Sequence, residues 1–127
     1  MAKNSKTFSF EFFPPKTASG QEKVISLGKE FESVPAEYYS VTFGAGGSTQ
    51  QGTIDTCRSL FNATKIPIAP HISGIGSDKS SIKSMLKLYK DEGFKKLVVL
   101  RGDLPSGFGS VGDFPYAINL IEFINES

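Results

Sequence analysis

The feature of the sequence that most constrains its fold is a repeat of about thirty residues, in which a strand is followed by a helix. Strands are predicted where β-branched and aromatic residues gather, with Gly or Pro near the end of each segment: 7–13, 38–45, 66–74 and 96–103. Helices are predicted where apolar residues recur at helical spacing: 19–32, 50–62, 78–92 and a fourth segment after Asp113. This alternation predicts a single α/β domain over residues 1–127, with a parallel sheet and right-handed crossovers.

The predicted helices have apolar stripes, and some have recognisable ends. Ser19 and Glu22 form a candidate capping box for the first helix, and Gly93 is a candidate C-terminal cap of the third. Phe114 and Pro115 are predicted to lie in the first turn of the fourth helix. The residues predicted to face the core are Val24, Leu27 and Phe31; Ile54, Cys57 and Phe61; Ile82, Met85 (or Leu86) and Tyr89; and Ala117, Leu120, Ile121 and Ile124.

Four polar residues recur with the period of the repeat. Glu11, Thr42, His71 and Asp103 each lie near the C-terminal end of a predicted strand. In parallel α/β folds, ligands bind at the carboxyl ends of the strands. The period therefore predicts that these four side chains converge on one ligand site.

Taken alone, each of these features has a plainer interpretation. Glu11 is equally consistent with an exposed edge position, His71 with a core histidine and Thr42 with an ordinary strand residue. The tripeptide at 101–103 is read as a chance match to an adhesion motif. The glycines of 44–47 fit neither the dinucleotide nor the Walker pattern, which favours a tight strand-to-helix turn. Only the shared period favours a ligand site over these plainer interpretations.

Composition excludes several functional classes. Hydrophobic residues make up 39% and charged residues 21% of the chain, as in ordinary globular proteins. A net charge of +1 gives no reason to expect a nucleic-acid or membrane partner, and there is neither a membrane-length apolar run nor a signal-peptide pattern. The single histidine excludes a multi-histidine metal site, and we expect no metal. Cys57 has no partner for an internal disulfide, which favours a cytoplasmic protein.

Four segments together resemble successive motifs of the methylenetetrahydrofolate reductase family: "FSFEFFPPKT", "YSVTFGAGGST", "IAPHISGI" and "LVVLRGDLP". The resemblance extends from Phe8 to about Phe123. It implies a (β/α)₈ TIM-barrel flavoprotein that uses FAD. The implied reaction passes a hydride from NAD(P)H to 5,10-methylenetetrahydrofolate and gives 5-methyltetrahydrofolate, in one-carbon metabolism and methionine biosynthesis.

The resemblance also implies roles for individual residues. Glu11 matches the general acid that protonates the folate, and Asp103 matches an aspartate that lies near the flavin and tunes its reactivity. The positions implied to contact the cofactor are Thr42, His71, Leu100, Arg101, Gly102, Asp103, Tyr116 and Ala117. The chain departs from the family pattern at Phe43, Gln50 and Gly74, where relatives often have Tyr, Arg and Cys.

The alternation of side chains along the first strand agrees with the role implied for Glu11. Glu11 shares a strand face with Ser9, whereas the phenylalanines at 8, 10 and 12 share the other face. In a barrel one face packs on helices and the other points inward. The phenylalanines suit the helix side, so Glu11 is expected at the barrel mouth, where an acid can donate a proton.

A negative charge from Asp103 should help the reduced flavin give up its hydride.

The length of the chain limits the barrel. A full barrel of this kind needs about 250 residues, whereas the 127 residues supply four βα units, a half-barrel with two open strand edges. Three interpretations follow: a truncated reductase that is inactive alone, a half-barrel that pairs with a second copy, or a non-catalytic flavin- or folate-binding module. We favour a self-associating N-terminal half, hence a homo-oligomer. The second fold considered, a flavodoxin-like open sheet, is disfavoured by the absence of a fifth strand.

Residues 104–113 are predicted to be a mobile loop over the site.

Overall fold

Strands and helices alternate along the described part of the chain. The computed structural model describes residues 6–43, 50–103 and 112–127. In chain order the elements are β1 (Ser9–Phe12), α1 (Ala18–Glu30), the short 3₁₀ helix η1 (Phe31–Ser33), β2 (Tyr38–Val41), α2 (Gln50–Ala63), β3 (Ile68–Ser73), α3 (Lys79–Asp91), β4 (Val98–Leu100) and α4 (Ala117–Asn125). The turn predicted at 44–47 and most of the loop predicted at 104–113 lie outside the described residues.

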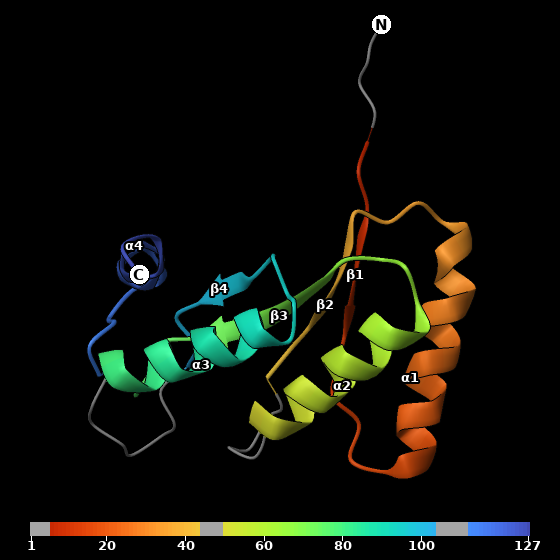
Figure 1. The fold of residues 1–127 in the computed structure, drawn as a ribbon, viewed down its shortest axis with the longest axis horizontal. Helices are drawn as coiled ribbons and strands as arrows, with labels where there is room; N and C mark the ends of the chain where they lie inside the picture. Colours follow the sequence, from red (N-terminus) through yellow and green to blue (C-terminus); the bar gives the residue numbers. More distant parts are fainter. Residues whose placement is uncertain (1–5, 44–49, 104–111) are drawn as a thin grey trace, which may run out of the picture.

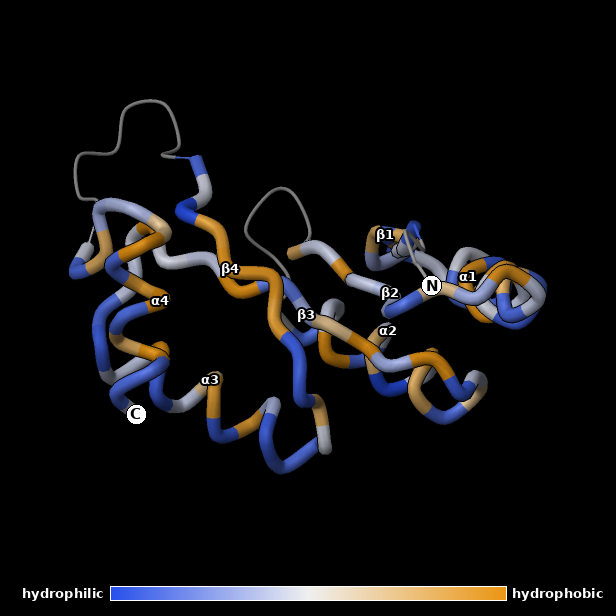
Figure 2. The backbone as a smooth tube through the Cα atoms, turned by 90° about the horizontal axis from the view of Figure 1, so that it is seen from above, coloured by the Kyte–Doolittle hydropathy of each residue, from blue (hydrophilic) through white to orange (hydrophobic). Residues whose placement is uncertain are grey.

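The strands form one parallel sheet in the order β1-β2-β3-β4. The helices α2 and α3 lie on the same side of the strands, with α1 and α4 at the two ends of the row (Figures 1 and 2). Glu11 is in register with Ser40, and His71 with Val98. The prediction of an α/β fold with four parallel βα units is confirmed.

The two faces of the sheet differ in chemistry because side chains alternate along each strand. On the outer face, apolar side chains are buried against the helices; those of the strands include Phe12, Tyr39, Val41, Ile68 and Ile72. On the inner face the same strands carry Glu11, Ser40 and His71. The helices therefore hold the sheet through the outer face and leave the polar inner face for a site.

The helix faces that pack on the sheet differ in part from those predicted. Ile82, Met85 and Tyr89 of α3 are buried as predicted, but Leu60 rather than Phe61 is buried on α2 and Leu27 of α1 is exposed. The reason is Gly28: a Cβ atom built there would lie 2.6 Å from Leu60 Cδ2, so the absent side chain lets Leu60 fill the contact between α1 and α2.

Two of the three predicted helix ends differ in the structure. Ser19 was the predicted cap of α1, but Thr17 caps this helix, its Oγ1 accepting from the amide of Gly20 at 3.0 Å. Helix α1 begins at Ala18, so Ser19 lies inside its first turn. Gly93 follows α3 in the left-handed conformation (φ +92°), as the prediction of a C-terminal cap requires.

Helix α4 begins later than predicted. Phe114 and Pro115 lie before its first residue rather than in its first turn. Phe114 is buried, and its ring lies 5.2 Å from the ring of Phe123, so its packing places it beside the helix instead of within it. Leu120 is buried as predicted, whereas Ile121 is exposed. Phe123 is partly buried against the core, whereas Ile121 faces away from it.

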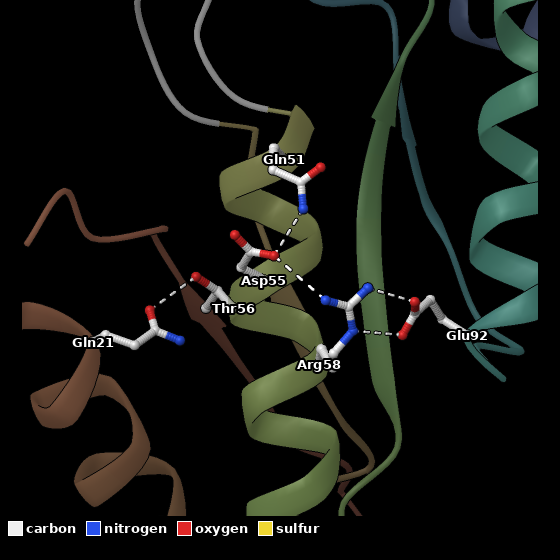
Figure 3. Close-up of polar contacts among 6 residues, drawn as sticks. All are labelled: Gln21, Gln51, Asp55, Thr56, Arg58 and Glu92. Atoms are coloured by element: carbon white, nitrogen blue, oxygen red, sulfur yellow. Dashed lines mark hydrogen bonds and ion pairs between the residues drawn. The ribbon is translucent and has the colours of Figure 1, made fainter. Parts of the chain in front are cut away.

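Polar contacts join the helices on the outer side (Figure 3). Arg58 of α2 donates from Nε to Glu92 Oε1 at 2.9 Å, and its second contact to this carboxylate makes the pair bidentate. These hydrogen bonds lower the pKa of the Glu92 carboxyl. On the other side of α2, Thr56 lies within hydrogen-bonding distance of Gln21 Oε1 at 3.3 Å. The helix α2 is thus linked to both of its neighbours. Among the described residues no helix is long and apolar enough to cross a membrane.

Candidate functional site

Glu11 and His71 meet on the inner face of the sheet, although β2 lies between their strands. Glu11 Oε1 is 3.4 Å from His71 Nε2. The Glu11 side chain is 53% exposed, whereas His71 is only 4% exposed. The pair therefore joins an accessible carboxylate to an almost fully buried imidazole, and the predicted convergence of these two residues is found in the structure.

The imidazole of His71 is buried without hydrogen bonds. Neither Nδ1 nor Nε2 has a hydrogen-bond partner among the described residues, and the contact with Glu11 lacks hydrogen-bonding geometry. Burial lowers the pKa of His71, and the nearby Glu11 charge offsets this only in part. A neutral imidazole offers one donor and one acceptor. Because buried polar atoms are normally paired, these two nitrogens mark an unsatisfied polar position beside Glu11.

The buried imidazole predicts a pH dependence of stability. The unfolded chain binds a proton at His71 near pH 6.5, but the folded chain binds it only at lower pH. We therefore expect the free energy of unfolding to decrease as the pH falls from about 6.5 through the lowered folded-state pKa. Denaturant unfolding at a series of pH values measures this effect, and the variant His71→Asn should lose it. An equal slope in both proteins over this range would contradict the prediction.

Thr42 lies directly after β2 and is fixed through its main chain. Its amide donates to the carbonyl oxygen of Phe12 at 3.0 Å, and its carbonyl oxygen accepts from Thr53 Oγ1 at 2.8 Å. Strand alternation places Thr42 on the same side as Ser40 and therefore as Glu11. The structure thus places Thr42 at the carboxyl end of the sheet, where it was predicted to contact a cofactor.

The segment 100–103 is held against the end of β3. The carbonyl oxygen of Arg101 accepts from the amide of Ile75 at 2.8 Å and from Ser73 Oγ at 3.1 Å. Gly102 has a φ of +87°, and a Cβ atom built on it would collide with the side chains of Ser73 and Ile75. The turn after β4 therefore requires glycine. Leu100, Arg101 and Asp103 are exposed.

Asp103 and Glu11 are not in contact. Glu11 lies on β1 and Asp103 follows β4, and these strands are the two edges of the sheet, three strand spacings or roughly 14 Å apart. A ligand that spans the strand ends could contact both, and the role of each acid stays a prediction.

Tyr116 and Ala117 lie at the start of α4. Tyr116 is the N-terminal cap residue and is exposed, and its amide donates to Asn119 Oδ1 at 3.1 Å. Helix α4 contacts β4, which places this pair in the same βα unit as Arg101. Among the residues that the structure describes, no hydrogen bond joins either residue to Glu11 or His71. Their predicted contact with a cofactor therefore rests on the resemblance.

A cavity of about 530 Å³ lies at the opposite end of the sheet. It lies where β3 and β4 begin, and its lining residues include Phe61, Ile66, Phe94, Lys95 and Lys96. The site residues lie toward the other ends of the strands, on the inner face. This cavity therefore belongs to no part of the predicted site. Groups of three or more metal-binding side chains are absent from the described ranges.

The departure from the family pattern at Gly74 has a local cause. A Cβ atom at this position would lie 3.0 Å from Phe114 Cβ and 3.2 Å from Leu120 Cδ2. The space for a larger residue is thus taken by α4 and the segment before it. Phe43 is half-buried next to the core, and the side chain of Gln50 lies outside the described part.

The sequence-based prediction missed two hydroxyl groups near the site, those of Thr53 and Tyr89. Thr53 donates to the Thr42 carbonyl, and Tyr89 donates to the His71 carbonyl at 3.2 Å. Tyr89 was predicted only as a core residue and Thr53 not at all. A hydroxyl residue on or beside an apolar helix stripe is the one signal that could have indicated them.

Comparison with known proteins identifies the family of this chain. The whole chain, residues 1–127, matches the family described as methylenetetrahydrofolate reductase. Methylenetetrahydrofolate reductase 2 of Schizosaccharomyces pombe is 34% identical over an alignment of 124 positions that covers 94% of this chain and 19% of that protein. 5,10-Methylenetetrahydrofolate reductase of Escherichia coli (strain K12) is 30% identical over 118 residues, 93% of this chain and 39% of that protein. The chain thus spans about a fifth to two fifths of the length of these curated relatives.

Proposed function

Because this chain belongs to the methylenetetrahydrofolate reductase family, we propose that it binds FAD at the carboxyl end of its sheet and contributes to the reduction of 5,10-methylenetetrahydrofolate. The observation that carries the proposal is the pair of Glu11 and His71, in which an accessible acid lies beside a buried imidazole without hydrogen bonds. The proposed setting is cytoplasmic one-carbon metabolism.

The residues that would hold FAD are those at the strand ends: Thr42, His71, Leu100, Arg101, Gly102, Tyr116 and Ala117. When bound, the flavin supplies hydride transfer from NAD(P)H to the folate. Glu11 lies on the exposed inner face and donates the proton that the folate needs as its five-membered ring opens. Asp103, at the other edge of the sheet, places a negative charge toward the same ligand. The neutral His71 has one donor and one acceptor to offer, and because both nitrogens are buried, neighbouring side chains would have to move before a ligand could reach them.

A titration of FAD with the purified chain tests the binding step. We expect quenching of the flavin fluorescence that saturates at one FAD per chain, and a weaker affinity for His71→Phe, which keeps a ring of similar size without nitrogens. The control Tyr38→Phe lies on the inner face at the start of β2, away from the strand ends, and should bind as the parent does. No saturable binding by the parent chain would refute the proposal.

The alternative function is a flavin- or folate-binding module without catalysis. It is favoured by the share of each relative that the chain covers, 19% in one case and 39% in another. Both functions use the same residues at the strand ends. Turnover of NADH with an artificial electron acceptor separates them, because a module that only binds should show the flavin spectrum and no turnover.

We also propose that a second copy of the chain completes the barrel. Within the described residues, β1 and β4 are the two edges of a parallel sheet. Exposed apolar side chains accompany both edges, with Phe8 and Phe13 beside β1 and Leu100 and Ile118 beside or over β4. A two-fold axis along the strands would pair β4 of one copy with β1 of the other in parallel. Light scattering should give twice the monomer mass, and a monomer at all concentrations would contradict this proposal.

A further inference from the structure

Two buried hydroxyl groups on the helices hold main-chain atoms of the residues at the strand ends. Thr53 on α2 donates from Oγ1 to the carbonyl oxygen of Thr42 at 2.8 Å. Tyr89 on α3 donates from its hydroxyl to the carbonyl oxygen of His71 at 3.2 Å. Thr53 and Tyr89 are almost completely inaccessible to solvent. The Tyr89 hydrogen bond is buried and that of Thr53 is partly buried, so water has little access to replace either partner.

The two contacts repeat one relation in successive βα units. In each unit, the helix that follows a strand donates to the carbonyl of a polar residue in or directly after that strand. The helices lie on the outer side of the sheet (Figure 2), whereas Thr42 and His71 direct their side chains to the inner side. The hydroxyl groups therefore reach the main chain from the side of the sheet opposite to the Thr42 and His71 side chains.

A fixed carbonyl sets the direction of the side chain. The peptide unit is planar, so holding its oxygen restricts rotation of the strand about its own axis. For His71 this matters most, because its imidazole makes no hydrogen bond of its own among the described residues. The hydroxyl of Tyr89 is the described side-chain group that holds the main chain at this position.

We propose that Thr53 and Tyr89 are positioning residues, which orient Thr42 and His71 toward the ligand at the carboxyl end of the sheet. This inference rests on the proposed function, because it takes FAD as that ligand. Removal of either hydroxyl is expected to raise the dissociation constant for FAD about five- to tenfold, the effect of losing one hydrogen bond in the core.

The chain offers matched controls for both changes. Tyr39 donates to the carbonyl oxygen of Gly28 at 2.7 Å, and Thr64 donates to that of Leu60 at 2.9 Å. Both are buried, but their acceptors belong to helices and not to the strand ends. Tyr89→Phe is therefore compared with Tyr39→Phe, and Thr53→Val with Thr64→Val. Each pair loses the same chemical group from the core, so a general loss of stability affects both members.

The experiment has two readouts, the FAD dissociation constant and the ¹⁵N shifts of the His71 ring in the chain without FAD. His71 is the only histidine, so its ring signals are unambiguous. Tyr89→Phe should move these signals and weaken FAD binding, whereas Tyr39→Phe should do neither; Thr53→Ser, which keeps the hydroxyl, should bind FAD as the parent does. Equal effects of Tyr89→Phe and Tyr39→Phe on both readouts would overturn the proposal. If the parent binds no FAD but Tyr89→Phe alone moves the His71 signals, the positioning role stands and the proposed function fails.

Discussion

Glu11→Gln is expected to slow reduction of the folate at least about a hundredfold, the usual contribution of a general acid. The change removes the proton but keeps the size of the side chain, and the carboxylate lies on the exposed inner face. Reduction of bound FAD by NAD(P)H requires no proton from Glu11 and should stay within about twofold. Rapid mixing of the FAD-loaded chain with each substrate in turn measures the two half-reactions separately.

The matched control for this prediction is Glu37→Gln. Glu37 is also exposed, but it lies just before β2, at the opposite end of the sheet from the site. This variant should leave both half-reactions unchanged. Similar losses in both half-reactions for Glu11→Gln would show that the residue acts in binding or folding rather than as the acid.

Gly102→Ala is expected to reduce the free energy of unfolding by about 2–4 kcal/mol and to abolish FAD binding at micromolar concentration. Its φ of +87° disfavours any side chain, and a Cβ atom would collide with Ser73 and Ile75. These two residues also hold the Arg101 carbonyl, so the collision should displace the whole turn after β4. Denaturant unfolding and FAD titration of the variant measure the two effects.

Gly76→Ala separates the cost of the main-chain conformation from the cost of the Cβ collision. Gly76 also has a positive φ, +71°, but a Cβ atom there would meet nothing within 4 Å. It should therefore lose only about 1–2 kcal/mol from the unfavourable main-chain conformation. If Gly76→Ala and Gly102→Ala reduced the free energy of unfolding equally, the collision with Ser73 and Ile75 would contribute nothing to the loss of stability.

The α/β architecture was predictable because it depends on local patterns that recur. Strand residues, glycines and helical spacing repeat every thirty residues or so, and parallel strands bring equivalent positions to one edge of the sheet. This argument alone placed Glu11 and His71 together, and the structure has them 3.4 Å apart. The same argument brought Asp103 into the group but gave no distance, and Asp103 lies at the far edge of the sheet.

The parts that were not predictable depend on contacts between elements. The burial of Leu60 instead of Phe61 follows from the close approach of α1 at Gly28, which no helical spacing encodes. The late start of α4 follows from the packing of Phe114 on Phe123. The hydroxyl of Tyr89 pairs with a strand 18 residues earlier in the chain, so its role appears only when α3 is placed on the sheet.

The most direct test of the account is whether FAD binds at His71. In a titration of ¹⁵N-labelled chain with FAD, the ring signals of this single histidine should shift progressively and saturate at one FAD per chain. A shift is expected because a ligand at the carboxyl end of the sheet would change the surroundings of a buried imidazole that has no hydrogen bond among the described residues. Saturable FAD binding that leaves the His71 signals unmoved, or no binding at all, would contradict a site at the carboxyl end of the sheet.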